Sequence, residues 1–210
     1  MLSAHIKTSI IFVGYMILTG CATSNINKEF DFIENSQTGV VIGSLTQDVS
    51  GSAYARYYMQ SVTDSSKPIT LHSRQQNLSG LMPGFVKSEF IGMDGRLFTI
   101  ELVEGEYKFT HWDVNSGSTN YFPVKLPTSL KFEVTAGEIV YLGNIHMRLI
   151  DDGMLPYISN KSERDIALFK QKYPKLTDHT IQIRPLAQGL WHSESDINDN
   201  LPIGEKPRFK

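Results

Sequence analysis

Two side chains in this sequence have the types and the spacing that acid–base catalysis needs. His111 and Asp113 flank Trp112 in a segment of alternating apolar residues. Residues two apart on a strand share a face and lie about 7 Å apart, so the carboxylate could orient the imidazole as a base. A hydrolase also needs a nucleophile, and the chain has no Gly-x-Ser-x-Gly motif. The pattern favours a solvated strand end over a catalytic pair, and we expect no catalytic residues and no enzymatic activity.

Metal and cofactor sites have no local signature. No histidine lies at ligand spacing from another histidine or from a glutamate. His146 and Met147 would be soft copper ligands, but neighbouring residues on a strand point to opposite faces. The Asp94-Gly95 and Asp151-Asp152-Gly153 sequences are typical of turns, and neither supplies the alternating ligands of a calcium loop. We therefore expect no metal and no cofactor.

The densest aromatic cluster is the candidate binding surface. Tyr54, Arg56 and Tyr58 alternate, so on a strand they share one face, and such tyrosine and arginine faces are enriched in binding patches. The alternative, which the sequence alone favours, is an edge strand packed against the core. Nucleic acid is not an expected partner, because 20 basic and 22 acidic residues give a net charge of −2 without a basic stripe.

The only cysteine, Cys21, follows a short apolar run near the N-terminus. That run, residues 10–18, would cover about 14 Å as a helix, half the hydrocarbon thickness of a bilayer. It is too short to span and has the length of a signal-peptide core. Two interpretations are open at this point. The segment is either an ordinary signal peptide in which the cysteine occurs by chance, or a leader in which the cysteine has a function.

Residues 18–21, Leu-Thr-Gly-Cys, resemble the lipobox of bacterial lipoproteins. In that family a peptidase cleaves before the cysteine, whose thiol then carries diacylglycerol. The resemblance implies cleavage between Gly20 and Cys21, lipid attachment at Cys21, and stable anchoring once two or more acyl chains are present. Ala22 stands where lipoproteins retained in the inner membrane have Asp, which implies the outer membrane, with the domain on its periplasmic face.

Four segments follow from these patterns. We expect a signal peptide at 1–20, a lipidated N-terminus and tether at 21–38, a β-sandwich domain with an inserted helix at 39–186, and an irregular polar tail at 187–210 anchored by Trp191. As a free coil the tether would separate lipid and domain by roughly 20–25 Å. Its Phe-Asp-Phe-Ile stretch at 30–33 is too apolar for that, and docking on the domain as a short strand is favoured over contact with the membrane.

Alternation with a period of two predicts the strands of this domain. Residues 98–109 are echoed at 130–141, with Gly105 and Gly137 at matching turns, which predicts two similar hairpins. The return strand of the second hairpin is expected to place Ile139, Tyr141, Ile145 and Met147 on one core face. Other predicted strands lie at 40–45, 54–62, 69–72, 85–91 and 180–184.

One helix is predicted at 162–173, with Ser162 and Asp165 forming a capping box and Pro174 ending it. Short strands with one late helix indicate a mainly β protein, an antiparallel immunoglobulin- or transthyretin-like β-sandwich. The two hairpins resemble those of carboxypeptidase regulatory domains and of uncharacterised envelope lipoproteins. This resemblance implies a fold and not a function.

The sequence therefore predicts a lipid-anchored envelope protein that is a non-enzymatic binding or structural module. Its partner would be another envelope protein or the cell wall. Three alternatives stay open: a subunit of a secretion or envelope machine, a cell-wall glycan-binding module, and an envelope hydrolase that uses His111 and Asp113. Small lipoproteins of type VI secretion are similar in size and expected fold, but this chain lacks their proline-rich strand motif.

The lipobox interpretation makes a direct prediction. A Cys21→Ser variant should carry no lipid and should leave the membrane fraction, because a serine hydroxyl cannot replace the thiolate that accepts the lipid. Metabolic labelling with a fatty acid and sedimentation of membranes would measure both effects. A variant that still sediments with the outer membrane would contradict the interpretation.

Overall fold

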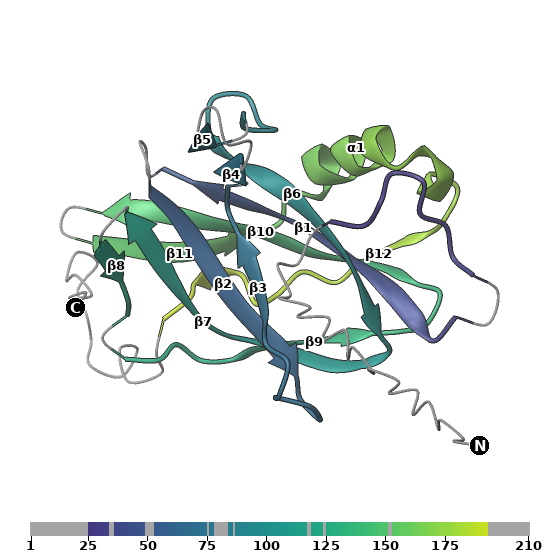
Figure 1. The fold of residues 1–210 in the computed structure, drawn as a ribbon, viewed down its shortest axis with the longest axis horizontal. Helices are drawn as coiled ribbons and strands as arrows, with labels where there is room; N and C mark the ends of the chain where they lie inside the picture. Colours follow the sequence, from purple (N-terminus) through teal and green to yellow (C-terminus); the bar gives the residue numbers. More distant parts are fainter. Residues whose placement is uncertain are drawn as a thin grey trace, which may run out of the picture.

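Two β-sheets packed face to face make up most of the protein (Figure 1). The computed structural model describes residues 25–33, 36–48, 53–74, 76–77, 84–85, 87–116, 119–123, 125–150 and 153–192. The mainly β sandwich with one late helix is confirmed. Gly20, Cys21 and the apolar run lie outside the described residues, so the lipobox stays a prediction. Within the described part of the chain, no helix is long and apolar enough to cross a membrane.

The first sheet, sheet A, has the strand order β13-β11-β10-β1-β6, and β12 also pairs with β10. Sheet B has the order β3-β2-β7-β8, and β9 also pairs with β7. The strands of sheet A are β1 (Thr38–Gln47), β6 (Asp94–Val103), β10 (Ile139–Ile150), β11 (Gly153–Ser159), β12 (Ile181–Ile183) and β13 (Gly189–Leu190). Those of sheet B are β2 (Ala53–Ser61), β3 (Ile69–His72), β7 (Gly105–Ser116), β8 (Thr119–Tyr121) and β9 (Leu130–Val134).

The pairing departs from a purely antiparallel sandwich at one strand. β10 pairs in parallel with β1 and with β12, whereas the other ladders are antiparallel. Parallel neighbours need a long connection between them. Here the connection from β1 to β10 contains all five strands of sheet B and also β6, which pairs with the other side of β1 in sheet A.

Both predicted hairpins are wrong, because each pair of strands is divided between the two sheets. β6 pairs with β1 in sheet A, while β7 pairs with β2 in sheet B. Likewise β9 pairs with β7 in sheet B and β10 with β1 in sheet A. Gly105 (φ 144°) and Gly137 (φ 74°) do adopt positive φ, as the turn chemistry requires. The echo in the sequence therefore marks two corners that connect the sheets.

A β-bulge in β10 corrects the predicted core face of that strand. Ile42 lies opposite Tyr141 and Ser44 opposite Asn144, so β10 has one extra residue, Gly143, with φ 107°. The extra residue reverses the alternation. Ile139 and Tyr141 consequently face away from sheet B, and Ile145 and Met147 face the core between the sheets.

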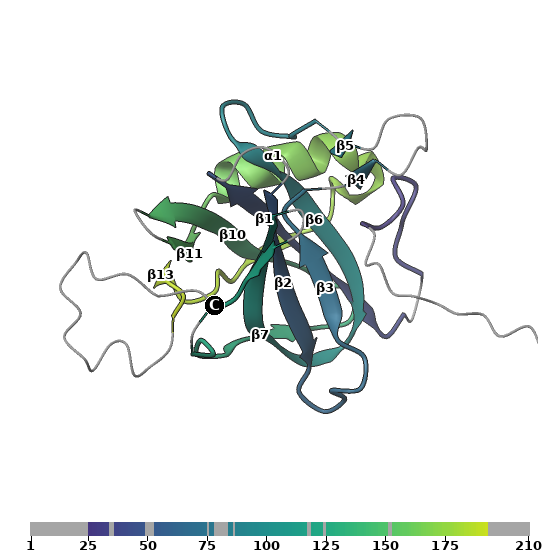
Figure 2. The ribbon, with the colours of Figure 1, turned by 60° about the vertical axis from the view of Figure 1, so that its left-hand side comes forward.

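Two hydrophobic clusters cover the two faces of sheet A. The larger lies between the sheets and contains the big side chains of Tyr57, Phe98, Phe109, Trp112 and Trp191. The smaller lies under helix α1 (Ser162–Lys172) and the short 3-10 turn at Pro174–Leu176, and contains Val40, Ile42, Leu97, Ile139, Tyr141, Phe169, Tyr173 and Leu176. Figures 1 and 2 show α1 beside β1 and β6.

Two local predictions near this helix are corrected. The strand expected at 85–91 is only β5 (Gly84–Phe85), which pairs with β4 (Gln76–Asn77), and a turn follows it. The capping box does not form: Lys161 is the N-cap, Ser162 is the first helical residue, and no side chain caps the helix. Asp165 is buried and binds other partners.

The expected docking of Phe30 and Phe32 is confirmed, although the segment is irregular and not a strand. Both rings pack on the smaller cluster. Asn25, the first described residue, donates to the Leu97 carbonyl at 3.0 Å and accepts from the Thr99 N–H at 3.0 Å. The described part of the predicted tether, residues 25–33, is therefore docked on the domain, and residues 22–24 lie between Cys21 and Asn25 in the sequence.

The start of the predicted tail belongs to the domain. β13 pairs with β11, and Trp191 is buried, with its Nε1–H donating to the Thr128 carbonyl at 2.7 Å. Its ring lies 6.4 Å from Tyr57 and 6.2 Å from Phe109, between centroids. The expectation that Trp191 anchors the tail is confirmed, whereas residues 193–210 lie outside the described residues.

Trp191 should therefore contribute strongly to stability. We expect Trp191→Ala to lower the free energy of unfolding by about 3–5 kcal/mol, because it empties a large buried site. Leu190→Ala, at the exposed neighbouring position, should change it by only about 0.5 kcal/mol. Urea unfolding of both variants measures the difference, and equal losses would contradict the assignment of Trp191 to the core.

Candidate functional site

The three predicted binding residues lie on the outer face of sheet B. Ala55, Tyr57 and Met59 point into the core, so the alternation turns Tyr54, Arg56 and Tyr58 outward. The strand that carries them, β2, lies between β3 and β7, so the expected edge strand is wrong. The same face receives His72 from β3 and His111 and Asp113 from β7.

An ion pair lies at the centre of this face. Arg56 is opposite Asp113, and its Nε–H and Nη2–H donate to the two carboxylate oxygens at 2.6 and 2.8 Å. The Tyr58 hydroxyl also donates to Asp113 Oδ2, at 2.9 Å. The carboxylate is buried, while the Arg56 side chain remains 22% exposed. The hydrogen bond with Asp113 raises the pKa of Arg56, so the guanidinium stays charged and held in place.

Stacked rings flank the ion pair on both sides. Tyr58 stacks on His111 with ring centroids 4.3 Å apart and planes within 5°. Tyr54 stacks on His72 at 5.6 Å and 12°. Tyr54 itself is buried, whereas Arg56, Tyr58, His72 and His111 are each partly exposed. The structure therefore brings the three predicted residues together, and leaves Arg56 and Tyr58 for contact with a partner.

Burial sets the protonation of these rings. It raises the pKa of Tyr58 to about 12, with the hydrogen bond to Asp113 adding to the effect. It lowers the pKa of both His72 and His111. At neutral pH the phenol is therefore protonated and the imidazoles are neutral. The face carries one internally neutralised ion pair and uncharged rings.

The proposed pair of His111 and Asp113 shares a face but is not connected. Both oxygens of Asp113 accept from Arg56, with Tyr58 as a further donor, and His111 Nδ1 lies 2.8 Å from the Thr110 hydroxyl. A carboxylate already held by a guanidinium does not orient the imidazole as a base. The hydrolase alternative therefore loses the geometry that motivated it.

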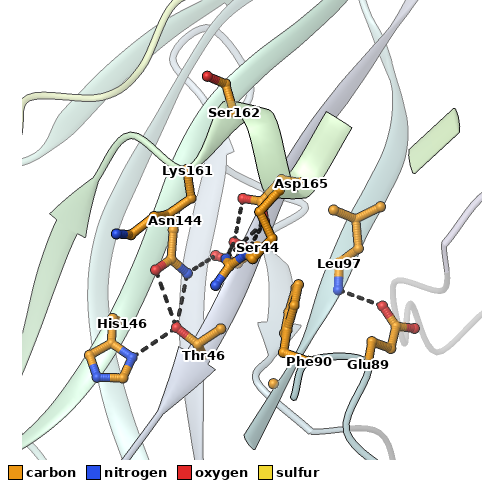
Figure 3. A network of polar contacts seen from close by, with 12 residues as sticks. Ser44, Thr46, Glu89, Phe90, Leu97, Asn144, His146, Lys161, Ser162 and Asp165 are labelled. Atoms are coloured by element: carbon orange, nitrogen blue, oxygen red, sulfur yellow. Dashed lines mark hydrogen bonds and ion pairs between the residues drawn. The ribbon is translucent and has the colours of Figure 1, made fainter. Parts of the chain in front are cut away.

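A second polar cluster, under helix α1, was missed by the sequence analysis (Figure 3). Asp165 Oδ2 accepts from the Ser44 hydroxyl at 2.6 Å and from the Tyr141 hydroxyl at 2.8 Å. Arg164 Nε–H donates to Asp165 Oδ1 at 2.8 Å. The Tyr141 oxygen accepts from the Lys161 N–H at 3.0 Å, so the group fastens the start of the helix to sheet A. The available signal was a serine, Ser44, inside an apolar run.

The cluster continues along sheet A through an arrangement that resembles a hydrolytic triad. His146 lies between the Thr46 hydroxyl, 2.8 Å from Nδ1, and Asp48 Oδ1, 3.0 Å from Nε2. Thr46 is fully buried, and its oxygen also accepts from Asn144 Nδ2 at 2.9 Å. A substrate cannot reach this hydroxyl, so we assign the cluster a structural role.

Metal binding finds no support in the described part of the chain, where no group of three potential ligands comes together. His146 and Met147 point to opposite faces, as expected, with Met147 in the core. In the cluster on sheet A the serine, threonine and Asp165 groups at the centre are buried, so the cluster on sheet B is the better candidate for contact with a partner.

The lowered histidine pKa values predict a pH dependence of stability. The unfolded chain protonates His72 and His111 below about pH 6.5, before the folded protein does, so stability is full above that pH and falls as the pH falls. Urea unfolding between pH 8 and pH 5.5 should show this loss, and a His72→Gln/His111→Gln variant should show a flatter profile. Parallel profiles would contradict it.

Comparisons with known proteins add no assignment. The chain matches no family model, no curated protein and no solved structure. Its function must therefore be argued from the outer face of sheet B and from the N-terminal sequence.

Proposed function

We propose that this protein is a lipid-anchored, non-enzymatic binding module of the bacterial outer membrane, and that it binds an envelope protein in the periplasm through the outer face of sheet B. The anchor rests on the lipobox-like sequence that ends in Cys21. The binding surface rests on one observation, the Arg56–Asp113 ion pair flanked by stacked rings.

The order of this face favours binding. Tyrosine and arginine contribute most of the energy in many protein interfaces. A side chain that is ordered only on binding loses rotamer freedom at that moment, which weakens association. Here Arg56 is fixed by two hydrogen bonds to Asp113, and Tyr58 is fixed by a stacked ring and a hydrogen bond, so this loss of rotamer freedom has already occurred on folding.

A protein partner suits these groups better than cell-wall glycan does. Sugars stack their C–H faces on broad exposed aromatic rings, but Tyr54 is buried and one face of the Tyr58 ring is covered by His111. Arg56 is already neutralised by Asp113, so an anionic ligand gains little from it. What remains exposed is a mixture of ring edges and hydrogen-bonding groups, including Asn120, which accepts from Arg56 at 3.2 Å.

Site-specific photo-crosslinking in the native envelope tests the proposal. A benzophenone amino acid at position 58 should give a discrete adduct with one envelope protein. The matched control is position 157, because Tyr157 is an exposed tyrosine on sheet A, away from the proposed face. Adducts of equal yield at both positions, or none at 58, would contradict the proposed surface.

A second arm addresses the glycan alternative. Wild-type protein should not sediment with isolated peptidoglycan, whereas a glycan-binding module would. If wild-type protein sediments with peptidoglycan, and Tyr58→Ala abolishes this sedimentation while Tyr157→Ala does not, the outer face of sheet B binds glycan. That result would contradict the proposed protein partner.

A further inference from the structure

The loop between β5 and β6 displays an apolar tip. Ile91 is fully exposed and Met93 is partly exposed, on either side of Gly92, which has a φ of 77° and open space around it. A single exposed apolar residue is ordinary on a protein surface. The importance of this tip comes from how the loop is built and from what lies beside it.

The loop is held firmly although its tip is exposed. The Ser88 hydroxyl donates to the Met93 carbonyl at 2.7 Å, which closes the turn. Phe90 is buried beneath the Arg164 guanidinium, whose carbon lies 4.2 Å from the ring centroid. Figure 3 shows Phe90 and Glu89 on this side of the network. The loop therefore presents Ile91 and Met93 on a fixed base.

The acidic side chains around the tip are already paired. Glu89 binds Lys172 Nζ at 2.5 Å and also accepts from the Leu97 N–H at 2.7 Å. Asp94 pairs with Arg74 at 3.8 Å. Residues 91–93 themselves carry no charge. Burying an unpaired charge is the main free-energy cost of transfer into an apolar phase. Moving the tip out of water would leave neither Glu89 nor Asp94 unpaired, so this cost is avoided for both.

The tip lies next to the point where the N-terminal segment meets the domain. Glu89 and Asn25 both bind Leu97, one at its N–H and the other at its carbonyl. Asn25 follows Cys21 by four residues, which reach at most about 14 Å when fully extended. A lipid on Cys21 would therefore hold this part of the domain close to the bilayer surface.

We propose that the loop at residues 87–94 lies against the membrane, with Ile91 and Met93 inserted into the interfacial region beside the acyl chains of Cys21. This inference rests on the proposed lipid anchor. The hollow at the base of the loop, lined by Arg74, Lys87 and Arg96 among others, has a volume of about 10 Å³, space for about one water molecule.

A depth-sensitive probe on the lipidated protein tests this contact. Because Cys21 is the only cysteine and would be acylated, Ile91→Cys creates one reactive thiol for an environment-sensitive fluorophore. The labelled protein is reconstituted into vesicles of phosphatidylethanolamine and phosphatidylglycerol with or without nitroxide-labelled lipid. We expect a blue shift of the emission and strong quenching by the nitroxide.

The matched control is Leu126→Cys, at another exposed apolar position in the connection from β8 to β9. Figure 1 shows this connection at the bottom of the view and the loop before β6 at the top. The control should stay unquenched. Protein that sediments with the vesicles but is unquenched at 91, or equally quenched at both positions, overturns the inference and leaves the anchor intact. Protein that does not sediment overturns the anchor, and the inference with it.

Discussion

The burial of β1 on both faces is the constraint on which the rest of the structure depends. Val41 and Leu45 face the core between the sheets, while Val40 and Ile42 face the cluster under α1. One strand therefore contributes to both hydrophobic clusters and pairs with β6 and β10 along its length. The approach is close: a Cβ on Gly43 would lie 2.5 Å from the Phe98 ring and 2.7 Å from the Gly143 carbonyl. Only glycine allows these three strands to pack in this way.

The polar end of β1 connects the three layers. Ser44 binds Asp165 in helix α1, and Gln47 reaches sheet B, where its Nε2–H donates to the Ala53 carbonyl at 2.9 Å. The Ala55 N–H donates to Gln47 Oε1 at 3.2 Å. These bonds fix the start of β2, the strand whose next outward residue is Arg56. The order of the candidate binding face thus depends on buried polar groups in sheet A, which are costly to leave unsatisfied.

The sequence predicted the β-sandwich, the helix and the shared face of Tyr54, Arg56 and Tyr58 because each depends on local alternation. It failed where tertiary pairing decides. The turn at Gly105 suits a hairpin or a corner equally, and only the ladder of β6 with β1 distinguishes them. Gly143 reverses the alternation of β10 by one residue, which periodicity alone cannot locate. Asp165 fits a capping box by spacing, yet a distant hydroxyl, Ser44, binds it.

Docking of residues 25–32 changes what a lipid anchor would do for this domain. A free tether of 17 residues would let the domain turn and sweep through roughly 20–25 Å, so its binding face would meet partners in any orientation. With Asn25 bound to β6, only three residues of sequence separate Cys21 from the docked chain, and the proposed lipid anchor would set both the height and the orientation of the domain. Such a restriction would raise the effective concentration of the binding face for partners held at the same membrane. It would lower that concentration for partners located elsewhere. The selectivity of a binding module built in this way would come from its short attachment as much as from Arg56 and Tyr58.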